Sequence, residues 1–483
     1  MKQLVRSILM TLFPLILVAQ DAPLFTSDFP PEEFAQRRAK VYDAIGPNAI
    51  ALLQGAPSPQ GYTRFRQFNE FYYLCGIEVP HAYLLLDGAQ RRATVFLPHR
   101  NDARERSEGK LLSAEDVELT KSLSGIDHVM ATDLLAEVLA RYGRSANVRT
   151  IFTPFAPPEG LAMSRDLAIR YNADVASDPF DGRMPRESHF IQLLRERFPM
   201  LEVKDLSPTL DALRLIKSPR ELELIRKATR LAGLAILEAM RSTVPGIYEY
   251  ELDAVAKYVF YRNGAQGEAY YSLVQSGPNA LYGHYNAGKR KMRDGDMLLF
   301  DFAPDVGYYM SDVTRVWPVN GKFSPSQREL YSFYLACYKA ILKNIRPGVT
   351  AQMIKQEAAA EMEQILAKTK FSKPLYEEAA RKFVTNYKSS AASPNTTLGH
   401  WTGMATHDVG FHTGPLQPGM VFTIEPSLVV REENINMRLE DLIIITETGM
   451  ENASAFVPME IEEIEKVMRE EGMLQRYPMD RGK

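Results

Sequence analysis

Two acidic residues stand on a pair of apolar segments that a tight turn joins. Residues 297–302 and 308–317 predict strands, and Pro304-Asp305-Val306-Gly307 between them has the composition of a turn. If the turn centres on Val306 and Gly307, Asp301 lies directly opposite Asp312, with Cβ atoms ~5 Å apart. Two carboxylates at that separation repel each other unless one is protonated or a cation lies between them, and a divalent metal is the common solution.

A second acidic pair has the same arrangement. Residues 420–424 are apolar and precede Glu425, residues 436–445 carry Glu440, and the polar stretch 431–434 predicts the turn between them. Glu425 and Glu440 are then also opposed. A single acidic residue on a strand is usually just a solvated position, but four residues in two matching hairpins predict a shared cation site.

A histidine cluster completes this set. The chain has eight histidines, of which His400, His407 and His412 lie within thirteen residues. A lone histidine here would more often be structural, but beside four carboxylates His400 becomes a candidate ligand. Such ligands suit two divalent ions, Mn²⁺ first, with Zn²⁺ or Co²⁺ as alternatives. Two ions ~3.5–4 Å apart can share a hydroxide that attacks a carbonyl, so the predicted reaction is metal-assisted hydrolysis of an amide.

The elements around these residues predict two domains. Short apolar runs such as 82–86 and 93–97 predict strands, and they alternate with amphipathic stretches such as 133–142. A helix start, Ser218-Pro219-Arg220-Glu221, follows a boundary near residue 205, and Ser324-Pro325-Ser326-Gln327 repeats its pattern. We expect four segments: a signal peptide (1–20), an N-terminal domain (21–205), a catalytic domain (206–475) and a C-terminal tail (476–483).

The chain begins like an exported protein. Lys2 and Arg6 precede an apolar run, 8–19, which is too short for a membrane span of roughly 20 residues and fits a signal peptide cleaved near Ala19 or Gln20. We therefore expect a periplasmic or secreted protein without a stable membrane anchor after cleavage. A formal net charge of -3 and the lack of a basic stripe argue against nucleic-acid partners. Two cysteines cannot form a tetrahedral thiolate metal site.

The candidate residues fall in an ordered series of motifs. Together the motifs cover nearly all of the expected mature chain, and the series resembles the aminopeptidase P and prolidase branch of the creatinase–methionine aminopeptidase ("pita-bread") family, the M24 metallopeptidases. The motifs are Phe65–Gly76, Ser276–Asn279, His284-Tyr285, Asp301, Ser311–Arg315, Leu398–Trp401, His407–Gly410, Thr423–Pro426 and Arg438–Asp441. This resemblance implies an α/β N-terminal domain of the creatinase/prolidase kind and an α+β pita-bread catalytic domain.

The resemblance also implies a role for each site residue. The two metals would be held by Asp301, Asp312, His400, Glu425 and Glu440. Asp301 and Glu440 would bridge the metals, and Glu425 would also act as general base. His284 and His407 would position the substrate and stabilise the oxyanion. Arg438 would support the substrate or the site, although a salt-bridged strand arginine is an equally good interpretation.

Two positions and one short stretch depart from the family pattern. Thr396 stands where relatives often have histidine, and Val429 stands where they usually have tyrosine. Residues 104–109 occupy a stretch in which relatives often place tryptophan. These changes remove no metal ligand, so they bear on turnover and substrate preference.

The implied activity is that of an Xaa-Pro aminopeptidase, which removes an N-terminal residue preceding proline from peptides. The resemblance further implies a homo-oligomer, a dimer or a tetramer. Two alternatives stay open: an Xaa-Pro dipeptidase (prolidase) with the same ligands, and a non-catalytic binding protein of the same fold. Arg315 and the stretch 317–321 resemble the aminopeptidases more than the dipeptidases.

Overall fold

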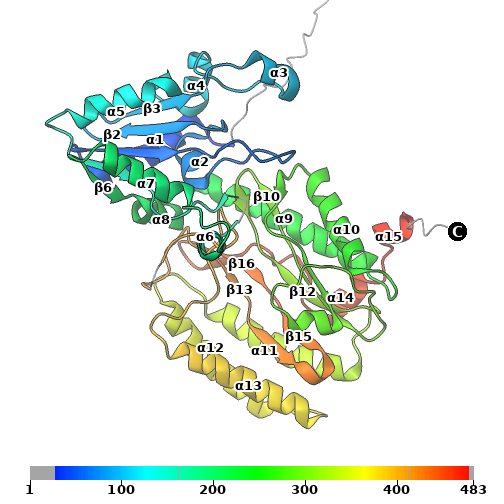
Figure 1. The fold of residues 1–483 in the computed structure, drawn as a ribbon. Helices are drawn as coiled ribbons and strands as arrows, with labels where there is room; N and C mark the ends of the chain where they lie inside the picture. Colours follow the sequence, from blue (N-terminus) through cyan, green and yellow to red (C-terminus); the bar gives the residue numbers. More distant parts are fainter. Residues whose placement is uncertain (1–27, 161–162, 412, 478–483) are drawn as a thin grey trace, which may run out of the picture.

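The computed structural model describes residues 28–160, 163–411 and 413–477, and it contains two domains (Figure 1). Of the predicted segments, the signal peptide 1–20 and most of the tail 476–483 lie outside this part of the chain. Within the described residues, no helix combines the length and the apolar character that crossing a membrane requires.

The N-terminal domain is built on a six-stranded mixed sheet in the order β4-β3-β2-β1-β5-β6. Its strands are β1 Ala49–Gln54, β2 Tyr83–Asp87, β3 Arg92–Leu97, β4 His128–Ala131, β5 Thr150–Thr153 and β6 Glu202–Asp205, which confirms the two strands predicted here. Its helices are α1 Pro31–Ile45, α2 Asn69–Cys75, α3 Asp102–Glu108, α4 Val117–Ser124, α5 Leu135–Gly143, α6 Arg165–Ser177 and α7 Arg186–Arg197.

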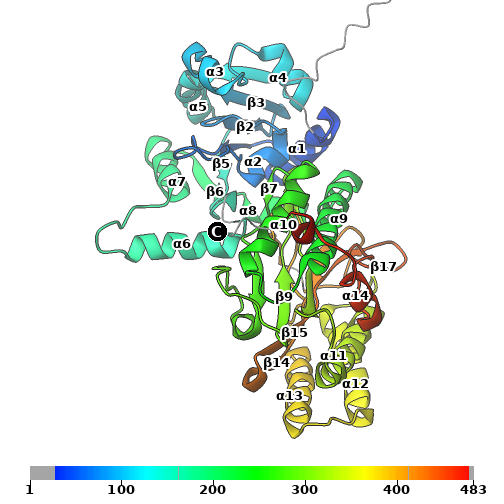
Figure 2. The same cartoon turned by 90° about the vertical axis from the view of Figure 1, so that its right-hand side faces the viewer.

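Successive side chains of strand β1 point into two different apolar cores. Ile50 and Leu52 pack into a small cluster against α5 and α7, whereas Ala51 and Leu53 belong to a core that continues into the catalytic domain. This follows from the period of two in a strand. One face of the N-terminal sheet therefore shares its apolar core with the second domain, and the two domains lie end to end in both ribbon views (Figures 1 and 2).

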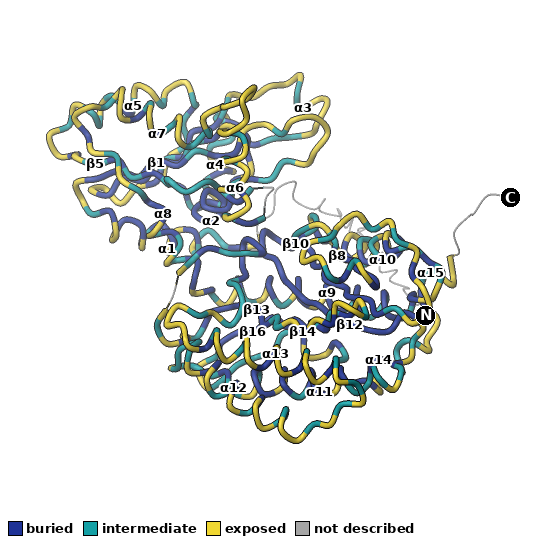
Figure 3. Tube along the Cα trace, turned by 60° about the horizontal axis from the view of Figure 1, so that its bottom comes forward, coloured by how far each residue is buried: buried dark blue, intermediate teal, exposed yellow. Residues whose placement is uncertain are grey.

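The catalytic domain surrounds short antiparallel sheets with helices. Its helices are α8 Ser207–Leu215, α9 Pro219–Ser242, α10 Glu249–Arg262, α11 Pro325–Asn344, α12 Ala351–Lys368, α13 Pro374–Ala391, α14 Ile461–Val467 and α15 Met473–Arg476. Both predicted helix starts are confirmed, because Ser218 and Ser324 each form a capping box with the residue three positions on. Figure 3 shows the strands buried and the outer faces of α12 and α13 exposed.

The strands of this domain form two long hairpins. The first contains β9 Met297–Asp301, β10 Pro304–Val306, β11 Tyr309–Met310 and β12 Thr314–Pro318, flanked by β7 Gly267–Glu268 and β8 Leu273–Ser276. The second contains β13 Val421–Ile424, β14 Ser427–Val430, β15 Ile435–Arg438 and β16 Asp441–Ile445, with β17 Met450–Asn452 beside it. A bridge between Thr314 and Glu440 joins the two hairpins, so their acidic residues share one surface.

The first hairpin has a different register from the predicted one. Asp301 pairs with Thr314 and Val306 pairs with Tyr309, so the turn centres on Gly307 and Tyr308 and the predicted pairing of Asp301 with Asp312 is wrong by two residues. Both turn residues have positive φ, 59° and 72°, as a type I′ turn requires, and the β-branched Val306 is unsuited to that conformation.

The second hairpin keeps the predicted register. Ile424 pairs with Asp441 and Ser427 pairs with Arg438, so the same register continues on both sides of Glu425 and Glu440. The 3-10 turn Arg431–Glu433 closes the hairpin, followed by Asn434 in the left-handed region. The opposition of the two glutamates is therefore confirmed.

Candidate active site

The five predicted ligands come together where the two hairpins meet. The His400 Nε2 atom lies 3.4 Å from an oxygen of Asp312, 3.5 Å from one of Glu425 and 3.8 Å from one of Glu440. A cation with bonds of about 2.1 Å separates neighbouring donor atoms by about 3 Å. The spacing of these atoms is thus close to that of ligands around a shared ion.

The orientation of His400 leaves its second nitrogen free for such an ion. Its Nδ1 atom lies 3.1 Å from the carbonyl oxygen of Trp401, which can only accept a hydrogen bond. Nδ1 therefore carries a proton, and Nε2 is the ring nitrogen that faces the carboxylates. The backbone N–H of His400 also donates to the hydroxyl of Thr423, which places the residue beside β13.

The carboxylates are buried and outnumber their cationic partners. Asp301, Asp312 and Glu440 are 3%, 5% and 1% exposed, whereas Glu425 is more accessible. Among the described residues only one guanidinium or ammonium group, that of Arg438, forms ion pairs with these carboxylates. Burial, and then the charge of a neighbouring carboxylate, raises the pKa of Asp312 and of Glu440 well above the usual range.

The donor set fits divalent cations. The Oε1 atom of Glu440 is buried and has no hydrogen-bond partner, although its Oε2 atom accepts from Thr314 at 2.7 Å. Donor atoms of Asp312, His400 and Glu440 lie within 4.8 Å of one another. Buried carboxylate oxygens beside an imidazole, one of them without a hydrogen-bond partner, suit a hard or borderline divalent ion. These donors therefore form a candidate divalent-metal site.

The three other predicted residues lie around this cluster. The ring of His407 is centred 4.1 Å from that of His400. Burial, and then the charge of His400, lowers the pKa of His407 to about 4, and the charge of His284 adds to this effect. His284 is exposed on the loop after the 3-10 segment Gly277–Leu281. Arg438 contacts Asp301 directly, so the salt-bridged interpretation of this arginine describes its observed contacts.

Three contact residues were missed by the sequence analysis. The hydroxyl of Tyr270 lies 2.5 Å from both Asp301 and Asp312, although it has only one proton to donate. Thr314 and Thr423 hold Glu440 and Glu425 through their hydroxyls. Each threonine lies two positions from an acidic residue on its own strand segment, a spacing that places both on one face. Nothing in the sequence pointed to Tyr270.

The departures from the family pattern lie outside the ligand cluster. Thr396 accepts a hydrogen bond at 2.8 Å from Lys355, a largely buried lysine on α12. Val429 is 36% exposed on β14, and the stretch 104–109 includes most of α3 in the N-terminal domain.

Comparisons with known proteins agree with this arrangement. Residues 223–447 match metallopeptidase family M24, and residues 34–152 match the N-terminal domain of aminopeptidase P. The Xaa-Pro aminopeptidase of Escherichia coli K12 is 30% identical over 467 residues, which span 92% of this chain and 98% of the relative. The human Xaa-Pro dipeptidase is 26% identical, over 89% of this chain and 91% of its own length.

A solved structure gives the same result. Zinc-substituted E. coli aminopeptidase P in complex with product superimposes with a TM-score of 0.72 at 28% identity, covering 92% of this chain and 99% of the other. The expected fold, an α/β N-terminal domain followed by an α+β pita-bread domain, is thereby confirmed. The chain belongs to the Xaa-Pro aminopeptidases of metallopeptidase family M24.

Proposed function

We propose that this protein is a dinuclear-metal aminopeptidase that hydrolyses the bond between an N-terminal residue and a following proline. One observation carries the proposal: the five predicted ligands converge in a buried cluster in which four carboxylates share a single arginine. Such a cluster is unfavourable without added positive charge. The similarity to Xaa-Pro aminopeptidases over most of the chain supports the same substrate class.

In this proposal Asp301, Asp312, His400, Glu425 and Glu440 would hold two divalent ions. We favour Mn²⁺ because four of the five ligands are carboxylates, with Zn²⁺ or Co²⁺ as alternatives. When bound, the ions would polarise the scissile carbonyl and make water a nucleophile at neutral pH.

The remaining steps belong to the chain's own side chains. Glu425, the most exposed of the four carboxylates, would take the proton of the attacking water on a carboxylate oxygen. His407 has a pKa of about 4, so it is neutral at pH 7 and would hold the substrate carbonyl through a ring N–H, together with His284. Arg438 would keep Asp301 and Glu440 in place through its ion pairs.

The decisive test compares two substrates with and without chelator. An Xaa-Pro-Yaa tripeptide and an Xaa-Pro dipeptide are offered to protein that begins near Asp21 and is loaded with Mn²⁺. Chelator-sensitive release of the first residue from the tripeptide supports the proposal. Cleavage of the dipeptide alone identifies a prolidase, and no cleavage of either peptide with two metals bound contradicts both enzyme assignments for these substrates.

A matched pair of variants tests whether Glu425 is essential for turnover. Glu425→Gln is expected to abolish turnover, whereas Glu432→Gln, an exposed position in the turn of the same hairpin, is expected to leave turnover unchanged. Wild-type activity of Glu425→Gln contradicts the assigned role.

Export and assembly are further parts of the proposal. The charge and apolar pattern of residues 1–20 supports export to a periplasm or to the medium, and the amino-terminal sequence of the mature protein tests this. A homo-oligomer is proposed on family resemblance, and sedimentation equilibrium measures its size.

A further inference from the structure

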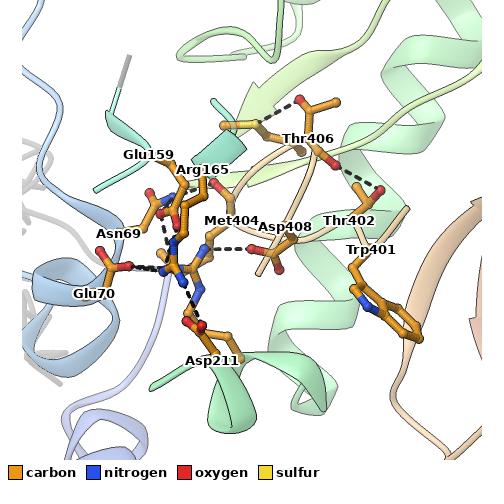
Figure 4. A network of polar contacts seen from close by, with 12 residues as sticks. Asn69, Glu70, Glu159, Arg165, Asp211, Trp401, Thr402, Met404, Thr406 and Asp408 are labelled. Carbon is orange, nitrogen blue, oxygen red and sulfur yellow. Dashed lines mark hydrogen bonds and ion pairs between the residues drawn. The ribbon is translucent and has the colours of Figure 1, made fainter. Parts of the chain in front are cut away.

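A buried network of charged side chains lies between the two domains (Figure 4). Its members come from the N-terminal domain, from α8 and the residues that follow it, and from the loop that carries the histidines. They are Glu70, Glu159, Arg165, Asp211, Arg214, Lys217 and Asp408. The side chains of Glu159, Arg214, Lys217 and Asp408 are at most 1% exposed.

Asp408 connects this network to the histidine loop. Its carboxylate oxygens lie 2.6 Å from a nitrogen of Arg214 and 3.2 Å from the ammonium of Lys217. Its backbone N–H donates to the carbonyl oxygen of Trp401 at 2.8 Å, which closes residues 401–408 into a loop. The same carbonyl oxygen faces Nδ1 of His400. Asp408 therefore fixes the base of the loop at the point where His400 and His407 come side by side.

The loop is shaped to let Asp408 approach its partners. A Cβ atom on Gly403 would lie 2.1 Å from a carboxylate oxygen of Asp408 and 2.8 Å from the side chain of Lys217. The carbonyl oxygen of Gly403 accepts from the backbone N–H of Met310, two residues before Asp312. On the other side, the amide of Asn69 donates to the carbonyl oxygen of Met404 at 3.0 Å. The loop is thus held by both domains.

Arg214 links carboxylates of the N-terminal domain to the loop. Its guanidinium contacts Glu70 at 3.0 Å and Glu159 at 3.2 Å while it holds Asp408. A planar guanidinium with five donors can bind several carboxylates in fixed directions, which an ammonium cannot do. Because all of these groups are buried, a displaced charge has no water to replace its partner.

We propose that Asp408 is a positioning residue: held by Arg214 and Lys217, it sets the relative placement of His400 and His407, and through Arg214 it makes that placement depend on the N-terminal domain. The catalytic part of this inference rests on the proposed function. The metal-binding part does not, because it concerns only the position of His400. Removing the charge of Asp408 should therefore affect turnover and metal affinity more than substrate affinity.

The test uses the full chain with Asp408→Asn, Arg214→Met and a control, Arg38→Met. Arg38 is a buried arginine of the N-terminal domain that donates to backbone carbonyls and does not contact the loop. Measured quantities are the melting temperature, the Kd of Mn²⁺ by calorimetry, and kcat and KM on an Xaa-Pro-Yaa tripeptide. Asp408→Asn and Arg214→Met are expected to lower kcat roughly 10–100-fold with little change in KM, and to weaken Mn²⁺ binding at least about tenfold.

The control shows whether the losses in Asp408→Asn and Arg214→Met come from displaced histidines or from lower overall stability. Arg38→Met is expected to lower the melting temperature to a similar extent while keeping kcat and Mn²⁺ affinity. The proposal is overturned if Asp408→Asn keeps both quantities within twofold of wild type, or if Arg38→Met loses them equally. If Asp408→Asn does not fold, Arg214→Lys carries the same test with the same criteria. A wild-type protein without peptidase activity refutes the proposed function, while the Mn²⁺ affinities still decide the positioning role.

Discussion

Neutralising Glu440 should stabilise the metal-free protein and reduce the stability that the protein gains from binding metal. Glu440 is 1% exposed, and its Oε1 atom has no hydrogen-bond partner among the described residues. A donor atom of Asp312 lies within 4.8 Å of it, and a repulsion of about 3–4 kcal/mol follows at an effective dielectric constant of about 20. Asp301 and Glu425 add to this repulsion, whereas the attraction of Arg438 at 3.8 Å offsets about one such interaction.

Glu440→Gln should therefore gain stability in chelator. We expect about 1–3 kcal/mol at pH 7, because partial protonation already relieves some repulsion in the wild type, and each kcal/mol raises the melting temperature by about 2–4 °C. With Mn²⁺ at about 100 times its Kd, the wild type gains about 2.7 kcal/mol from binding and the variant gains less. The lead of the variant in melting temperature should therefore shrink in Mn²⁺. Thermal unfolding in chelator and in Mn²⁺ measures both effects.

The neighbouring residue provides the control. Asp441 is equally buried but forms its own ion pair with Arg315 at 2.7 Å. Asp441→Asn should lose about 3–5 kcal/mol in both buffers, because it leaves a buried arginine unpaired. A Glu440→Gln protein that melts below the wild type in chelator would refute the reasoning, since the carboxylate cluster would then be balanced without added cations.

Three further predictions follow from contacts in and beside the site. Tyr270→Phe removes the hydroxyl shared by two aspartates and should weaken Mn²⁺ binding by about 10–100-fold in calorimetry, and an unchanged Kd contradicts this. His407→Ala should lower kcat by about 10²-fold while the bound-metal stoichiometry stays at the wild-type value, and loss of a metal would show that His407 is itself a ligand. The interdomain network has three cations and four carboxylates, and burial and then the charge of Glu159 raise the pKa of Glu70 to about 7. The stability that Glu70 contributes is complete below its unfolded pKa of about 4.3 and is lost as the pH rises through about 7, so the wild type should lose stability over that range relative to Glu70→Gln in denaturant titrations. Parallel pH profiles of the two proteins contradict this assignment.

The register of the hairpin that carries Glu425 and Glu440 could be predicted because its pattern is local. Two segments mark its strands, and the polar stretch 431–434 between them sets the register. The hairpin that carries Asp301 and Asp312 was predicted two residues out of register. Its turn includes Tyr308 at positive φ. The ring of Tyr308 stacks on that of Tyr72, with ring centres 3.7 Å apart, and this contact helps to maintain the turn. Tyr72 belongs to the other domain, so no local pattern contained this information.

The sequence by itself determined the chemistry: which side chains can bind metal, that they lie on two hairpins and a histidine segment, and which family arranges them in this order. Only the tertiary structure decided how they are held. Tyr270 reaches two aspartates from a separate segment, and Arg214 joins Asp408 to carboxylates of the N-terminal domain. The physical reason is that burial makes each charge depend on partners from distant parts of the chain, and distant partners leave no periodic signal in the sequence.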